Sequence, residues 1–273
     1  MWRRDEMSGV IDALCRRYGV EDIRSLRRAL IEAEDKQLGR PVLMRLFHDL
    51  PRWRRVAQVA ALRRIRSIRH PNIVWLWNYA LLPDGTVVHV LERLGGPTVA
   101  DVIRPGQGID RREAARIVLE AARGLGALHE AGVVHGDVSP SNLLLDRATV
   151  KLGDYEFATV VDHVPRAAEG LYSGTPAYTA PELASGCGFP TPQSDLYSLG
   201  CVYYELLTGR PPHVAGSVLE ALYLHATADV PDARRWRPDL SDAEVELLGR
   251  LLARIPAQRV GSARELVDLL GAL

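Results

Sequence analysis

The sequence predicts an α+β fold with a small strand-rich part, containing one helix, followed by a larger and mainly helical part. The strand-like runs fall within residues 20–91. After residue 110 the apolar residues recur instead at the spacing of helices. The break Gly95-Gly96-Pro97 lies between the two patterns, and we expect the hinge between the two parts there.

In the small part, one helix is expected among the strands. Pro51 suits the start of a helix because the first turn needs no N–H from it, and His70-Pro71 ends the helical pattern. The expected elements are a short helix over residues 5–18, extended segments over 20–47 with a polar turn at 34–37 and the clearest strand at 41–47, a helix from Pro51 to about Ile68, and strands over 73–82 and 86–91.

The large part is expected to be built around a buried helix. Residues 195–208 are apolar on every side, which predicts a helix that is covered all round. A helix with one apolar stripe is expected over 111–131, and a loop over 132–142 leads to two short strands. The last two helices start with the Ser-x-x-Glu pattern of a capping box, at Ser241 and Ser262.

The composition is that of an ordinary globular protein. The 273 residues include 34 basic and 34 acidic side chains and are 47% apolar, which excludes collagen-like and disordered chains. No apolar run approaches the roughly 20 residues of a membrane span, and the N-terminus lacks a signal-peptide core. Cys15, Cys187 and Cys201 are too few and too scattered for a disulfide scaffold or a zinc site. We therefore expect a cytoplasmic protein without a membrane partner.

The zero net charge conceals an asymmetry. Residues 1–75 carry 17 basic and 9 acidic side chains, a net charge of +8, so the remainder carries −8. Lys36 and Lys151 are the only lysines, so arginine stands where many proteins use lysine, as expected for a GC-rich bacterial genome. Two interpretations stay open: the two halves pack together or are solvated separately, or the first half presents a surface for anions.

Five motifs, in order along the chain, resemble those of protein kinases. Residues 133–142, Val-Val-His-Gly-Asp-Val-Ser-Pro-Ser-Asn, resemble the catalytic loop, although alone they would also fit small-molecule phosphotransferases. Residues 150–156 occupy the place of the Asp-Phe-Gly segment, and 174–182 match the end of an activation segment. Residues 194–212 resemble the central helix of the large lobe, and 256–259 the late arginine motif.

The resemblance is best to bacterial Ser/Thr kinases and covers nearly the whole chain. It implies a bilobal kinase-like fold, with a small lobe over residues 18–94, a large lobe over 95–273 and an N-terminal extension over 1–17. It also implies that Asp195 hydrogen-bonds the catalytic loop and that Arg259 pairs with Glu182.

The same resemblance assigns candidate site residues. Asp137 would be the catalytic base, and Ser139 takes the place of the lysine that approaches the γ-phosphate. Asn142 and Asp154 would hold Mg²⁺, since oxygen ligands suit a hard cation. The residues expected around ATP are Arg45, Leu43, Glu92, Leu94 and Leu144.

Several features of the kinase pattern are missing from the small lobe. No glycine occurs between Gly19 and Gly39, so the glycine-rich loop that lets backbone amides approach phosphates is absent; its glycines would fall on Ile23, Ser25 and Arg28. Arg45 replaces the phosphate-binding lysine, and a planar guanidinium is no equivalent of a compact ammonium.

The helix glutamate that pairs with this lysine is also missing. It falls on Ala61, and no Asp or Glu occurs between Asp49 and Asp84. Leu43 replaces the alanine that touches adenine and either reaches toward Leu144 to fill the pocket or turns away from it.

Two further replacements affect the large-lobe side of the site. Glu156 replaces the glycine after Asp154-Tyr155, either adding a carboxylate at the metal site or pointing into solvent. Gly136 replaces the arginine before the catalytic Asp, which argues against activation by phosphorylation of Thr159, Ser173 or Thr175.

These losses favour a pseudokinase that acts as a regulatory or scaffolding module, with weak or no phosphoryl transfer. The alternative is an active atypical Ser/Thr kinase that uses Arg45, Asp137, Asn142 and Asp154. ATP and Mg²⁺ are cofactors only if the pocket is open. We expect a protein partner and no nucleic acid, and because the sequence ends at Leu273, just past the last predicted helix, we expect regulation in trans.

Two surfaces of the small lobe are candidates for that partner. The predicted helix after Pro51 is rich in arginine and contains no acid, which indicates either a solvated face or a binding surface; its arginines are Arg52, Arg54, Arg55, Arg63, Arg64, Arg66 and Arg69. Trp75, Trp77 and Tyr79 are expected on one face of a strand, and we interpret them as core rather than as a partner patch.

Overall fold

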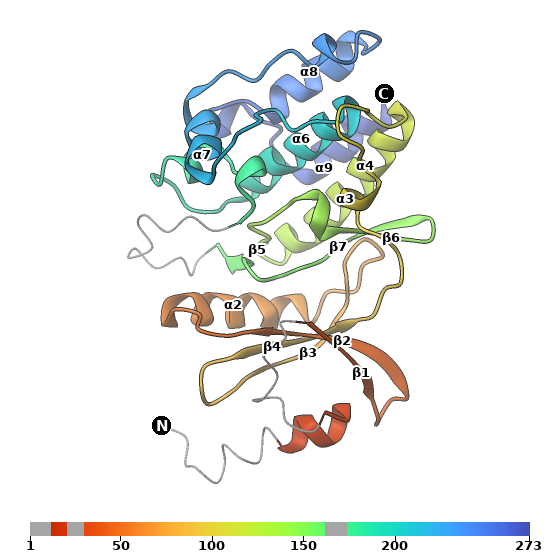
Figure 1. The fold of residues 1–273 in the computed structure, drawn as a ribbon, viewed down its shortest axis with the longest axis vertical. Coiled ribbons are helices and arrows are strands. Elements are labelled where there is room, and N and C mark those ends of the chain that lie inside the picture. Colours follow the sequence, from red (N-terminus) through yellow and green to blue (C-terminus); the bar gives the residue numbers. More distant parts are fainter. Residues whose placement is uncertain (1–11, 21–29, 162–173) are drawn as a thin grey trace.

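The computed structural model describes residues 12–20, 30–161 and 174–273, and it has the two-part α+β architecture that the sequence predicts. A small lobe built on a sheet lies below a larger helical lobe in Figure 1. The chain passes from one lobe to the other between residues 92 and 99, the region of the predicted hinge.

The small lobe is a four-stranded antiparallel sheet in the order β1-β2-β4-β3. Its strands are β1 (Leu30–Asp35), β2 (Arg40–Phe47), β3 (Leu76–Leu81) and β4 (Val87–Glu92). Helix α2 (Arg52–Ile65) lies between the sheet and the large lobe, and a helical segment at residues 12–18 lies on the other side of the sheet (Figure 1). The rest of the helix expected over residues 5–18 lies outside the described residues.

Strict alternation along β2 decides which side chains reach the site. Val42, Met44 and Leu46 are buried in a cluster with Leu14 and Tyr18 of the N-terminal segment. The residues between them therefore point to the opposite face, toward α2 and the large lobe. Arg45 lies on that face.

The third strand differs from the expectation. Ile73 forms a parallel bridge to Leu152, and the Val74 N–H donates to the Leu152 carbonyl at 2.9 Å, so these residues pair with the large lobe and β3 starts only at Leu76. A β-bulge between Leu76 and Asn78 then shifts the alternation.

Because of the bulge, the prediction that Trp75, Trp77 and Tyr79 share one face of the strand is wrong. The rings of Trp75 and Trp77 are in edge contact at 4.9 Å, but Trp77 packs with the Met44 side of the sheet while Tyr79 packs with the main core on the α2 side. All three are half-buried. Trp77 and Tyr79 pack against the two core clusters, as expected for core residues, whereas Trp75 is a member of neither cluster.

The large lobe is organised around α6 (Pro192–Thr208), which is buried on nearly all sides as predicted. α4 (Arg111–Glu130) packs against α6 and α9. The remaining elements are α3 (Val99–Val102), β5 (Val133–Val134), β6 (Leu143–Asp146), β7 (Thr149–Leu152), β8 (Thr159–Val160), α5 (Pro181–Ala184), α7 (Val218–Thr227), α8 (Asp242–Leu251), α9 (Ala263–Gly271) and short 3-10 turns at Pro140–Asn142, Pro176–Tyr178, Ala233–Arg235 and Pro256–Gln258.

The two predicted caps behave differently. Ser241 and Glu244 form a full capping box at the start of α8. Ser262 accepts from the Glu265 N–H, but the Glu265 carboxylate accepts from Gly261 rather than from Ser262.

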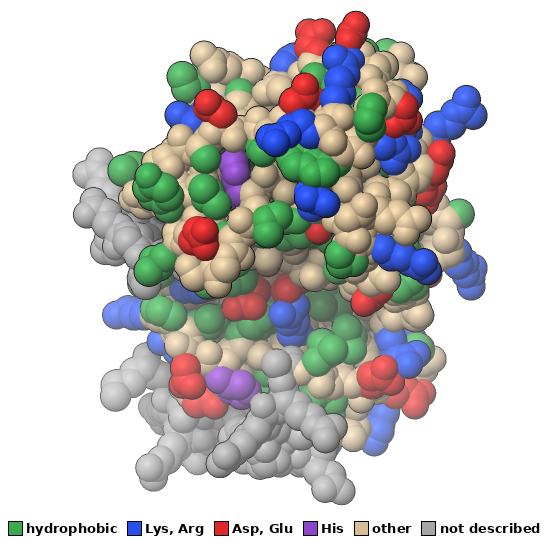
Figure 2. Space-filling model, turned by 45° about the horizontal axis from the view of Figure 1, so that its top comes forward, with side chains coloured by type: hydrophobic (Ala, Val, Ile, Leu, Met, Phe, Trp, Pro, Cys, Tyr) green, Lys and Arg blue, Asp and Glu red, His purple; other side chains and the backbone are tan. Residues whose placement is uncertain are grey.

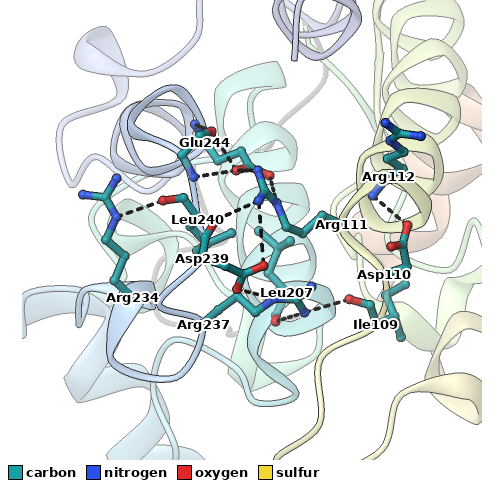
Figure 3. Close-up of polar contacts among 11 residues, drawn as sticks. Ile109, Asp110, Arg111, Arg112, Leu207, Arg234, Arg237, Asp239, Leu240 and Glu244 are labelled. Carbon is teal, nitrogen blue, oxygen red and sulfur yellow. Dashed lines mark hydrogen bonds and ion pairs between the residues drawn. The ribbon is translucent and has the colours of Figure 1, made fainter.

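Glu244 has a second role that joins distant elements (Figure 3). Its carboxylate pairs with Arg111 at the start of α4, and Arg111 also donates to the Asp239 carbonyl at 2.7 Å. Arg237 donates to the Ile109 carbonyl at 2.9 Å. This network ties α4 to α8 far from the lobe junction, so it supports the scaffold rather than the site.

Charges of both signs are interspersed on the large lobe in Figure 2, so the net negative charge of that part does not gather into one acidic patch on this face. No helix among the described residues combines the length and hydrophobicity that a membrane span requires.

Candidate functional site

The loop between β5 and β6 is held in place by Asp195. This residue, 1% exposed, lies near the start of α6. Its carboxylate accepts from the backbone N–H groups of His135 and Gly136, both at 2.9 Å, and lies 2.8 Å from Nε2 of His129. These are the contacts to the loop that the sequence predicted for Asp195.

Gly136 fits this loop because of its backbone. Its φ of +78° is in the left-handed region, and a Cβ there would lie 2.7 Å from the Phe157 carbonyl oxygen. The residue at this position therefore has to be glycine unless the segment around Phe157 moves.

Asp137 is fixed by hydrogen bonds from two sides. Its Oδ1 accepts from the backbone N–H and the hydroxyl of Thr175, both at 2.8 Å. Its Oδ2 accepts from Nδ2 of Asn142 at 2.9 Å, and the same amide donates to the Asp137 carbonyl at 2.8 Å. Asp137 is thus joined to the end of the segment at 174–182 and to the candidate metal ligand Asn142.

The two candidate metal ligands lie on adjacent backbone. The Gly153 N–H donates to the Asn142 carbonyl at 2.9 Å, which brings the residue after Gly153 beside the loop. Asp154 itself has a φ of +60°, a left-handed conformation that costs a non-glycine residue about 1–2 kcal/mol. The surrounding contacts must hold it there.

The strongest of those contacts comes from the small lobe. The guanidinium of Arg45 forms a close ion pair with the Asp154 carboxylate. A second nitrogen of Arg45 lies 3.7 Å from Oε2 of Glu156. Arg45 is 28% exposed and the Asp154 side chain 13%, so water screens this pair less than it would a surface pair.

Glu156 also contacts α2. Its Oε1 lies 3.9 Å from Nη2 of Arg54, and its backbone carbonyl accepts from Nε2 of Gln58 at 3.1 Å. Burial raises the pKa of the Glu156 carboxyl, and the nearby Asp154 raises it further, while the two arginines lower it. The side chain therefore points into the lobe junction rather than into solvent, which decides between the two expectations for it.

Neither lysine replaces Arg45. Lys36 lies in the turn between β1 and β2, with its side chain against Gly19. Lys151 forms an ion pair with Glu92 at 2.7 Å. Ala61, at the position of the missing helix glutamate, is completely buried.

The other predicted nucleotide residues lie at the lobe junction. Leu43, Leu94 and Leu144 are partly buried and pack against the same core cluster, from β2, the hinge and β6. The Glu92 carboxylate accepts from the Trp75 N–H at 2.8 Å in addition to Lys151. Ser139 is 1% exposed, and its hydroxyl has no hydrogen-bond partner among the described residues.

The oxygen atoms of Asn142 and Asp154 are of the kind that Mg²⁺ prefers, but the negative charge available to the cation is reduced. Asn142 offers an amide oxygen and Asp154 a carboxylate, both suited to a hard cation. Asp154, however, is already neutralised by Arg45. No group of three or more His, Cys, Asp or Glu side chains in the described part of the chain is placed to hold a metal ion.

Fold and loop contacts together define a kinase-like protein, and the comparison with known families agrees. The protein kinase domain model matches residues 56–269. The chain therefore belongs to the protein kinase family.

Bacterial Ser/Thr kinases are among its relatives. It is 30% identical over 243 residues to the Ser/Thr-protein kinase PrkC of Bacillus subtilis, covering 86% of this chain and 36% of PrkC. It is 35% identical over 248 residues to the DNA damage-responsive Ser/Thr-protein kinase RqkA of Deinococcus radiodurans, covering 87% and 36%. For PknB of Mycolicibacterium smegmatis the identity is 33% over 251 residues, with 86% and 39% covered. The chain thus spans little more than a third of these relatives.

Some residues of the site were not found from the sequence. Thr175 was considered only for phosphorylation, although it binds Asp137 directly. Arg54 is expected from the sequence only as one arginine of a basic helix, and Gln58 is not singled out at all. Their contacts with Glu156 span about a hundred residues of sequence. The one sequence signal for the contact between Glu156 and α2 is that the helix lacks its usual glutamate while an additional glutamate follows Asp154-Tyr155.

Proposed function

We propose that this chain is a pseudokinase: a kinase-like module that regulates or scaffolds a protein partner and transfers phosphoryl groups weakly or not at all. The observation that carries the proposal is the ion pair between Arg45 and Asp154. In this arrangement Arg45, which would bind the nucleotide phosphates, and Asp154, which would bind Mg²⁺, neutralise each other.

The competition has consequences for both ligands. To bind Arg45, phosphates would have to displace Asp154 and Glu156. To bind Asp154, Mg²⁺ would have to displace Arg45. The glycine-rich loop and the helix glutamate, which would otherwise help to position the phosphates, are absent from the sequence. Since catalysis of phosphoryl transfer depends on positioning and charge stabilisation, the loss of several of these parts leaves little rate enhancement.

An active atypical Ser/Thr kinase is the second candidate, and one observation favours it. Asp137 accepts hydrogen bonds from Thr175 and Asn142, and Asp195 accepts one from the backbone of the same loop. In that function Asp137 would orient the acceptor hydroxyl, Ser139 would lie beside it, and Asn142 with Asp154 would hold Mg²⁺. Arg45, Leu43, Glu92, Leu94 and Leu144 would surround ATP.

The remaining expectations belong to the same proposal. We place the protein in the cytoplasm, with one kinase-like domain over residues 18–273 after an extension over 1–17. Its partner is a protein rather than a nucleic acid. The three free cysteines among the described residues are compatible with a reducing compartment.

The test compares phosphoryl transfer by the wild type and by Asp137→Asn, using labelled ATP, Mg²⁺ and both autophosphorylation and a generic acceptor protein. The proposal predicts equal, background-level incorporation in the two. Incorporation by the wild type clearly above that of Asp137→Asn would establish the active kinase instead. In the organism of origin, Asp137→Asn is expected to complement a deletion of the gene as well as the wild type does.

A further inference from the structure

We propose that Glu156 performs the task of the missing helix glutamate. It anchors Arg45 of the sheet and Arg54 of α2 to the segment after Asp154, and so holds the small lobe against the large lobe without a nucleotide. This positioning role rests on the proposed function for its biological purpose, but the contacts of Glu156 hold the lobes together whether or not the chain transfers phosphate.

The geometry of the Glu156 carboxylate supports this role. Its two oxygens face two different arginines, with Oε2 3.7 Å from Arg45 and Oε1 3.9 Å from Arg54. One arginine belongs to β2 and the other to α2, whereas Glu156 belongs to the large lobe. A single side chain therefore links β2 and α2 to the large-lobe turn between β7 and β8.

The backbone of Glu156 is held by α2 as well. Gln58, one turn after Arg54 on α2, donates to the Glu156 carbonyl at 3.1 Å. The Arg54 guanidinium also lies over the ring of Phe157, 4.0 Å from its centroid. One face of α2 is thus attached to residues 156 and 157 by three different kinds of contact.

Partial burial of the three side chains and the lack of acids in α2 also favour this role of Glu156. The exposed fractions of the side chains are 25% for Glu156, 18% for Arg54 and 28% for Arg45, so their interactions are only partly screened. No acidic residue exists in α2, so the helix cannot itself provide a carboxylate for either arginine. A glycine at position 156, as in the family pattern, would leave Arg54 without the ion-pair partner that the structure gives it.

The experiment is a double-mutant cycle in the full chain, without nucleotide. Arg45→Gln, Glu156→Gln and the double variant are unfolded in urea, and the cycle is repeated with Arg54→Gln in place of Arg45→Gln. The matched control is the exposed pair Arg93 and Glu32, 3.0 Å apart, with Arg93→Gln and Glu32→Gln. A second measurement is the hydrogen exchange of α2 amides in Glu156→Gln, with α6 amides as reference.

The inference predicts a coupling of about tenfold in the unfolding equilibrium constant for at least one Glu156 cycle, against at most about threefold for the exposed pair. It also predicts faster exchange in α2 and unchanged exchange in α6. Additive effects in both cycles, or unchanged exchange in α2, would overturn it. Because no ATP is present, this result is independent of the phosphoryl-transfer assay: an active enzyme with strong coupling would refute only the proposed function.

Discussion

The guanidinium of Arg45 and the carboxylate of Asp154 form an ion pair across the lobe junction. The resemblance to protein kinases implies that the first residue stands in the place of the phosphate-binding lysine, and the second in the place of a metal ligand. An arginine offers several donors in a fixed plane and holds a carboxylate more firmly than a lysine does. Under the proposed function, two side chains that the resemblance assigns to ligands are thus partners of each other.

Gly136 gives a first prediction, because it stands where the family has arginine. Gly136→Arg is expected to destabilise the fold by about 3 kcal/mol or more, since a side chain there is both strained and too close to the Phe157 carbonyl. The control is Gly186→Arg, at a similar φ of +70° with no atom within 4 Å of the added Cβ. It should lose only about 1 kcal/mol. Equal losses in urea unfolding would show that the contact with Phe157 is unimportant.

Tyr155 gives a second prediction. Its buried hydroxyl donates to the Val74 carbonyl, which belongs to the segment joining α2 to β3. Tyr155→Phe should cost about 1–3 kcal/mol because that carbonyl loses a donor in a dry environment. Tyr203→Phe is the control: the Tyr203 hydroxyl is buried and has no partner among the described residues, so its removal should be neutral or stabilising. Thermal unfolding of the two variants measures both effects, and the reverse order would refute this reading.

The pair of Arg259 and Glu182 is the third case. Arg259 is buried and donates to both carboxylate oxygens of Glu182, at 2.9 and 2.6 Å. Arg259→Gln should cost about 3–5 kcal/mol because Glu182 loses its counter-ion. Arg254→Gln, which breaks an exposed pair with Asp229, should cost at most about 1 kcal/mol. Chemical denaturation distinguishes them, and similar costs would contradict the argument.

His89 gives a prediction about pH. It is fully buried in β4, and both ring nitrogens lack partners among the described residues. Burial, with a smaller contribution from the nearby Arg45, lowers its pKa to about 3. The unfolded chain binds a proton at this histidine below about pH 6.5 while the folded chain does not. Stability present above pH 6.5 is therefore lost as the pH falls toward 3, at up to about 1.4 kcal/mol per pH unit.

The variant His89→Leu removes that titration. Its stability should fall less steeply than that of the wild type between pH 6 and pH 4.5. Urea unfolding across this range provides the measurement. Parallel curves for His89→Leu and the wild type would mean that His89 is protonated in the folded protein.

The sequence predicts those contacts that depend on motif identity. The support of the loop by Asp195 and the pair of Glu182 with Arg259 were both expected and are both present. The lobe architecture was also predicted, because the strand and helix periodicities are strong and are separated by a clear break.

Contacts set by packing could not be predicted in this way. The bulge after Leu76 turns Tyr79 to the other face, and nothing in the local sequence marks it. The meeting of Glu156 with Arg54 depends on how α2 sits on the large lobe, which no local pattern encodes. The absence of a helix acid was visible in the sequence, but its replacement became visible only when the two lobes were seen together.

The central claim is that the ion pair between Arg45 and Asp154 keeps both side chains from binding ATP and Mg²⁺. A thermal-shift titration with ATP, with and without Mg²⁺, tests it most directly. A ligand at 100 times its dissociation constant would stabilise the fold by about 2.7 kcal/mol, a shift of several degrees for a protein of this size. The account predicts no Mg²⁺-dependent rise in Tm at millimolar ATP. A rise that requires Mg²⁺ would show that Asp154 and Asn142 hold the metal despite Arg45, and would contradict it.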